Sequence, residues 1–227
     1  MKKGLPVFDW LFSIVVALLV GCQTPSHHSQ AGGDPRRAPP IERRYRVVDP
    51  PIGDRPPIRF RFPPPVDDYK GEAAKLRGEF LACEQPAKGV PAGWFEVIVT
   101  DVTMGEPELD SNIRFNVEAL EGKRFATIRY VVEFVDCPAG NPGDRSERTP
   151  IVFHGRFEMK GRSVPLVVNG WMDAPQVTPG SAERILSAGW RLGSLKEIFG
   201  IVGPGGPDEP AGDRMDFDLR AAVRPME

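Results

Sequence analysis

Residues 152–168 read VFHGRFEMKGRSVPLVV, and this stretch decides the fold class. In its first half, apolar and polar side chains alternate, which is the period of a strand with one buried and one solvent-facing side. Residues 160–163 then supply a short turn before a second apolar run begins at Val164. Strands joined by so short a connection are antiparallel neighbours. The stretch therefore predicts a β-hairpin.

The same two-residue period recurs along the chain from about residue 44. Turn-rich segments separate the runs, notably residues 138–144 and 203–207. About seven or eight strands with mostly short connections predict an all-β fold, either an antiparallel barrel or a sandwich. The alternating runs are residues 58–62, 94–100, 126–134, 152–159, 164–168 and 215–223.

Helical signals are few. Residues 109–120 place apolar side chains at near-helical spacing behind a cap at Asp110 or Ser111. Ser194 and Glu197 fit a capping box before two apolar residues. We therefore expect one or two short helices beside the strands.

Length and charge exclude several classes of protein. The chain has 227 residues, enough for one ordinary domain after a targeting segment and a linker. Its 29 basic and 31 acidic residues give a net charge of −2, which provides no extended positive field for nucleic acid. We exclude a nucleic-acid partner on this ground.

The N-terminus has the pattern of a bacterial lipoprotein signal. Two lysines precede an apolar run over residues 11–21, which as a helix would span only about 16 Å, too short to cross a bilayer. Leu19-Val-Gly-Cys22 resembles the lipobox, in which the cysteine is acylated and becomes the new N-terminus. We expect residues 1–21 to be a signal peptide, and acylated Cys22 to anchor the protein to a membrane of the cell envelope. By analogy with a sorting rule, Gln23 favours the periplasmic face of the outer membrane.

Residues 22–44 have the composition of a flexible tether. They contain His27-His28, Gly32-Gly33 and several prolines, with almost no apolar periodicity. Such a segment cannot bury enough apolar surface to offset the entropy of ordering. The folded domain is expected to occupy residues 45–227.

Two cysteines, Cys83 and Cys137, remain in this domain. An exported protein meets an oxidising compartment, so they could form a disulfide. Two buried thiols are the other interpretation, because a sequence does not show whether two Cα atoms lie within about 7 Å of each other.

We find no catalytic constellation in the sequence. The one histidine of the domain, His154, shares the polar side of its predicted strand with Arg156 and Glu158. No HExxH, CxxC or GxSxG motif occurs, and the glycine-rich residues 203–207 lack the Lys-Ser/Thr of a phosphate loop. We therefore expect no enzyme activity, no metal site and no cofactor.

Five segments in order carry a family resemblance. They are residues 45–50 with 58–62, the Gly-x-Phe strand at 76–80, residues 96–102 with 109–111 and Phe115, the hairpin at 154–168, and residues 198–201 with 221–224. This ordered set resembles the YceI-like family of bacterial periplasmic proteins and covers about residues 45–224. The resemblance implies a lipocalin-like closed antiparallel barrel of about eight strands that encloses an isoprenoid or similar amphiphilic chain.

An eight-stranded barrel is either filled by its own side chains or holds one slender ligand. Gly155 and Gly189 would leave room for a chain, and Tyr130 and Trp190 could orient a head group. The candidates for the inner wall, equally expected of a packed core, are Ile58, Phe60, Phe62, Phe80, Val97, Val99, Ile128, Tyr130, Val132, Phe153, Phe157, Leu166, Val168, Trp190, Phe217 and Leu219.

Two functions follow from this reading of the sequence. The first is a membrane-tethered periplasmic protein that binds or carries a polyisoprenoid or other long-chain amphiphile without catalysis. The second is a filled barrel that docks onto another envelope protein and binds no ligand.

Overall fold

The computed structural model describes residues 43–48, 55–83, 86–138, 148–173, 183–206 and 208–226. The predicted signal peptide, Cys22 and all but the last two residues of the predicted tether lie outside the described residues, as does most of the turn predicted at 138–144. Pro39–Glu227 form one compact unit, and every member of its main hydrophobic core lies between Tyr45 and Val223. Among the described residues, no helix has the length and apolar character needed to cross a membrane.

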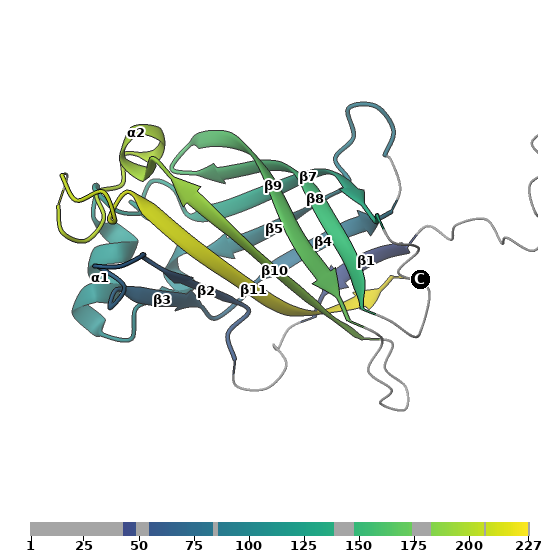
Figure 1. Cartoon of the computed structure of the whole chain (residues 1–227), viewed down its shortest axis with the longest axis horizontal. Coiled ribbons are helices and arrows are strands. Elements are labelled where there is room, and N and C mark those ends of the chain that lie inside the picture. The colour runs from purple at the N-terminus through teal and green to yellow at the C-terminus, as the bar shows by residue number, and fades with distance from the viewer. Residues whose placement is uncertain are drawn as a thin grey trace, which may run out of the picture. The chain divides into compact units, whose positions relative to one another are not determined.

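Eight antiparallel strands close into a barrel, as Figure 1 shows, so the predicted fold class is confirmed. Each strand pairs with the next one in the list below, and the last strand, β11, pairs with the first, β1. The seam between β9 and β10 is short: residues 169–172 pair with residues 186–189, so residues 162–168 of β9 have no described strand partner on that side. The strands are β1 (Arg43–Val47), β4 (Arg77–Ala82), β5 (Gly93–Ile98), β7 (Thr127–Asp136), β8 (Thr149–Met159), β9 (Arg162–Met172), β10 (Arg184–Gly193) and β11 (Arg214–Pro225).

At one end of the barrel the wall branches into three short strands. They are β2 (Ile58–Arg61), β3 (Lys70–Ala73) and β6 (Val102–Thr103). β2 pairs with the first half of β11 and β1 with its last residues, so β11 belongs to both branches. β5 continues through the 3-10 turn Val99–Asp101 into β6, which pairs with β3.

The alternation along each strand places the apolar side chains inside. In β2, Ile58 and Phe60 are buried while Arg59 and Arg61 are exposed. The run predicted at 94–100 ends earlier than expected, because Val99 and Thr100 belong to the 3-10 turn.

The predicted hairpin is formed by β8 and β9, and its turn is tighter than expected. Met159 pairs with Arg162, so the turn contains only Lys160 and Gly161. Their φ angles are 51° and 69°, which are the positive values that a two-residue type I′ turn requires.

The first predicted helix is displaced from its expected position. α1 spans Pro107–Phe115, with Glu106 as its N-cap and proline at its start, and residues 117–120 form a turn. Neither Asp110 nor Ser111 is the cap. The fixed φ of Pro107 suits the first helical turn, so the helix begins there.

The second predicted helix, α2, spans Leu195–Phe199, but it lacks the predicted capping box. Ser194 has a φ of 53°, in the left-handed region, and its side chain makes no capping hydrogen bond. Asp213 supplies the cap instead: its Oδ1 accepts a hydrogen bond from the Lys196 N–H at 2.7 Å. Both helices lie at the end of the barrel away from β1 and the C-terminus (Figure 1).

Candidate ligand-binding cavity

An apolar cavity of about 90 Å³ lies inside the barrel. Strands β5, β7–β11 and β2 surround it, and Ile113 of α1 and Leu120 of the following turn close it at the α1 end. The cavity surface presents only apolar atoms, so no polar group of the wall competes for a ligand. Such a space favours hydrocarbon over water.

Most of the predicted inner-wall residues do line this cavity. They come from seven different strands, and all of them lie on the inward side of the alternation. They are Ile58, Phe60, Val97, Ile128, Tyr130, Phe153, Phe157, Leu166, Val168, Trp190, Phe217 and Leu219.

Four predicted residues are buried but are not among the residues that line the cavity. Phe80 and Val132 belong to the fully buried core. Val99 packs against the turn that follows α1, where a Cβ on Gly122 would lie 2.7 Å from its Cγ1. Phe62 follows β2 and is 2% exposed. In the structure, these four residues are part of the packed hydrophobic core.

The sequence analysis missed several lining residues for two different reasons. Phe95, Met159 and Met215 lie inside predicted strands, at the next inward position beside Val97, Phe157 and Phe217, so applying the alternation to the whole of each run would have found them. Strands β3 and β6 are too short to show a period, and they supply Ala73 and Val102. The missed residues are Ala73, Leu76, Phe95, Glu96, Val102, Ile113, Leu120, Arg129, Met159, Leu186, Ala188 and Met215.

The two glycines expected to make room for a ligand do not do so. Gly189 is exposed and is not among the residues that line the cavity. Gly155 is buried, but a Cβ there would lie 2.1 Å from the carbonyl oxygen of Val131. Gly155 therefore allows β7 and β8 to approach closely beside the bulge at Val132 and Phe134.

The two predicted polar handles differ in their availability. The Tyr130 hydroxyl donates its hydrogen to backbone carbonyls, with the oxygen of Leu166 at 2.8 Å and that of Phe153 at 3.1 Å. Burial raises the pKa of Tyr130 well above its usual value, so the hydroxyl stays neutral. Trp190 stacks on Phe217 with ring centroids 5.0 Å apart, and its indole N–H has no hydrogen-bond partner in the described part of the chain. The Trp190 N–H thus lacks a described protein partner, but it is buried and is not presented on the cavity surface, where only apolar atoms are exposed.

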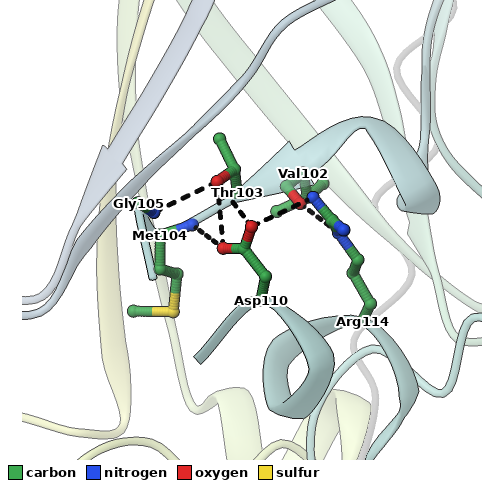
Figure 2. Close-up of polar contacts among 6 residues, drawn as sticks. All are labelled: Val102, Thr103, Met104, Gly105, Asp110 and Arg114. Atoms are coloured by element: carbon green, nitrogen blue, oxygen red, sulfur yellow. Dashed lines mark hydrogen bonds and ion pairs between the residues drawn. The ribbon is translucent and has the colours of Figure 1, made fainter. Parts of the chain in front are cut away.

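A polar clasp holds α1 against β6, as Figure 2 shows. The Asp110 carboxylate accepts hydrogen bonds from the Met104 N–H at 2.5 Å and from the Thr103 hydroxyl at 2.8 Å. Arg114 adds an ion pair to Asp110 at 3.3 Å and donates to the carbonyl of Val102. The Met104 hydrogen bond is the main reason why the pKa of Asp110 lies below its usual value, with smaller contributions from Thr103 and Arg114.

The opposite end of the barrel is tied covalently. Cys83, after β4, and Cys137, after β7, form a disulfide with Cα atoms 5.2 Å apart. Of the two interpretations left open by the sequence, the structure has the disulfide. Next to it, the Phe80 ring packs against Tyr45 at 5.5 Å and Phe153 at 5.2 Å between centroids.

His154 lies apart from the cavity, on the polar side of β8, as predicted. Its ring stacks on Phe134 with centroids 4.1 Å apart, and its Nε2 lies 3.2 Å from an Asp136 carboxylate oxygen. Within the described residues, no group of three or more His, Cys, Asp or Glu side chains could hold a metal ion.

No protein-family model matches the sequence, and no curated protein matches it. Several solved structures do match the fold. BcnA of Burkholderia cenocepacia aligns with a TM-score of 0.52 and 11% identity over 73% of this chain and 94% of its own. A polyisoprenoid-binding domain from Saccharophagus degradans, implicated in plant cell wall breakdown, aligns with a TM-score of 0.51 and 7% identity over 82% and 95% of the two chains.

A YceI protein of Campylobacter jejuni aligns with a TM-score of 0.54 and 10% identity over 70% of this chain and 86% of its own. At such low identity, the similarity concerns the arrangement of the strands. The resemblance found in the sequence is thereby confirmed for the fold, and the chain has the barrel architecture of YceI-like proteins.

Proposed function

We propose that this protein binds the apolar chain of a long-chain amphiphile, such as a polyisoprenoid, inside its barrel and does not change it chemically. The observation that carries the proposal is the cavity wall, which presents only apolar atoms within a closed barrel. Burial of a hydrocarbon chain there would provide the affinity, at about 25 cal/mol per Å² of apolar surface.

The fold comparison supports the same class of ligand. One protein with this architecture is described as a polyisoprenoid-binding domain. The N-terminal sequence supports a tether: we propose that acylated Cys22 anchors the barrel in the cell envelope, on the periplasmic face of the outer membrane.

The cavity must enlarge to accept a long chain. Its volume of about 90 Å³ is well below the range of about 300–1,000 Å³ that is usual for ligand sites. Two parts of its boundary are suited to move. Trp190 and Phe217 are only partly buried, and α1 has no fully buried residue.

The small volume also favours a second candidate function. A filled barrel could serve as an interaction module for another envelope protein, with a partner contacting its outer wall. Val167 and Trp171 are 52% and 45% exposed on the outer side of β9 and would suit such a contact.

The deciding experiment is native mass spectrometry with solvent extraction. Residues 39–227 contain the whole compact unit, and they would be exported to a bacterial periplasm with a cleavable signal and purified without detergent. A co-purifying long-chain lipid of defined stoichiometry would support the proposal. An empty protein that also takes up no polyisoprenoid when offered one would favour the interaction module.

A pair of tryptophan variants tests the site itself. Phe157→Trp enlarges a side chain on the cavity wall, whereas Val167→Trp adds the same ring on the outside of β9. We expect Phe157→Trp to abolish lipid uptake and Val167→Trp to leave it unchanged. Equal uptake by both variants would show that the lipid binds elsewhere.

A further inference from the structure

The segment that closes the cavity also carries exposed apolar side chains. Ile113 and Leu120 line the cavity, whereas Phe115 and Val117, which lie between them in sequence, are 42% and 65% exposed. The Leu120 N–H donates to the Ile113 carbonyl at 3.0 Å, so these residues belong to one compact turn. One side of this turn faces the cavity and the other presents a phenyl ring and an isopropyl group to solvent.

Basic side chains lie on the segment that follows this exposed pair and on the neighbouring hairpin. The Lys123 ammonium lies 6.0 Å from the centroid of the Phe115 ring, and the Arg124 guanidinium lies 5.0 Å from that of Phe125. Lys160, at the tip of the β8–β9 hairpin, donates to the Val117 carbonyl at 2.7 Å and so fixes the turn. Basic residues with apolar stems beside exposed apolar groups are typical of surfaces that meet a membrane interface.

The charge around the pair is nearly balanced, with Lys123, Arg124 and Lys160 against two acidic side chains. Glu118 is exposed and Glu121 is half-buried in the same turn, where they offset Lys123 and Arg124. Attraction to anionic lipids is therefore weak, and insertion of apolar side chains is the stronger driving force.

We propose that Phe115 and Val117, followed along the chain by Lys123 and Arg124, form a patch that docks onto a phospholipid bilayer. We call it the α1-end patch. The inference rests on the proposed function, because a hydrocarbon chain that moves between a bilayer and the cavity would otherwise have to cross water. Phe115 and Val117 lie between the two cavity-lining residues Ile113 and Leu120. Docking through the patch would therefore place the cavity next to the bilayer.

The test is flotation of residues 39–227 with phosphatidylcholine vesicles at millimolar lipid, without added ligand. The double variant Phe115→Ser/Val117→Ser removes the patch. Val90→Ser is the matched control, because Val90 is 55% exposed in the loop before β5, at the disulfide end of the barrel. All three positions are exposed, so the variants should fold, which circular dichroism would check.

We expect the double variant to lower the vesicle partition coefficient at least about tenfold, and Val90→Ser to leave it within about twofold of wild type. Binding of the wild type should persist in about 0.5 M salt. Equal partitioning of all proteins would overturn the inference. So would binding that requires anionic lipid and disappears in salt, or self-association through the patch when no vesicles are present.

The outcomes also separate this inference from the proposed function. If the periplasmic protein contains lipid but vesicle binding does not depend on the patch, only the docking inference fails. If the protein neither contains nor takes up lipid while vesicle binding does depend on the patch, the proposed function fails and membrane docking remains.

Discussion

The two ends of this barrel are built from different interactions. At the disulfide end, Cys83 is bonded to Cys137, and Tyr45 and Phe80 are completely buried. At the α1 end, the interior contains a cavity, and hydrogen bonds of Asp110 and Arg114 to residues 102–104 tie the covering helix to the end of the wall. One end is closed by apolar packing and a covalent bond, and the other by a polar clasp.

This difference bears on how the ends can move. Water cannot replace the contacts of a buried aromatic ring, but it can replace hydrogen bonds at a partly exposed clasp. Local opening at the α1 end should therefore cost less free energy than global unfolding. The proposed binding of a lipid chain requires one end to open while the rest of the barrel stays folded, and this division is suited to it.

The largest expected effect comes from the disulfide end. Phe80→Ala removes a completely buried ring outside the cavity and should lower the free energy of unfolding by about 3–5 kcal/mol. Phe157→Ala, on the cavity wall, should cost less, about 2–3 kcal/mol, because this ring already borders empty space. Urea unfolding of the two variants measures the difference. A larger loss for Phe157→Ala would show that the cavity end carries the stability.

The disulfide should have the next largest effect. It links residues 54 positions apart, and removing it with Cys83→Ala/Cys137→Ala should cost about 2–4 kcal/mol, chiefly because the unfolded chain gains freedom. Denaturant unfolding of the variant against the oxidised wild type gives the value. Hydrogen exchange of α1, measured under native conditions, serves as the control. Loss of protection in α1 as large as that in β4 and β7 would contradict the independence of the two ends.

The wall of this barrel could be predicted from the sequence because it repeats one physical rule. Alternation placed Phe60, Phe157 and Phe217 inside and Arg59 outside, and the structure agrees. Each strand buries one side independently of the others, so local sequence is enough to orient it.

The α1 end could not be predicted in the same way. The position of Asp110 suggested a helix cap, but its carboxylate binds Thr103 and Met104 of the preceding segment. That role depends on where β6 and α1 meet in space, which no local pattern encodes. The volume of the cavity likewise depends on side chains from many strands. Alternation therefore predicts which residues face inward, but it does not predict how much space remains between them.

A smaller effect is expected from the clasp itself. Asp110→Ala removes the acceptor for Thr103 and Met104 and should cost about 1–2 kcal/mol, because these hydrogen bonds are charge-assisted but partly exposed. Hydrogen exchange of residues 103–115 should rise by about tenfold, the factor that corresponds to about 1.4 kcal/mol, while β4 and β7 stay protected. Glu108→Ala, an exposed change on the same helix, is the control. Uniform loss of protection across the barrel would show that the α1 end does not open separately.

The smallest effect is a dependence of the clasp on pH. The pKa of Asp110 is lowered in the folded state, so the stability that it contributes is complete above its unfolded pKa of about 3.8 and is lost as the pH falls through the lower folded pKa. Protection of α1, corrected for intrinsic exchange rates, should therefore be constant from pH 7 to about 5 and decline only below about 4. Asn at position 110 cannot titrate. In Asp110→Asn, the protection of α1 should therefore be weaker at neutral pH, and the decline below about pH 4 that Asp110 causes should be absent. If α1 lost its protection near pH 6, a group with a higher pKa than Asp110 would have to control the opening.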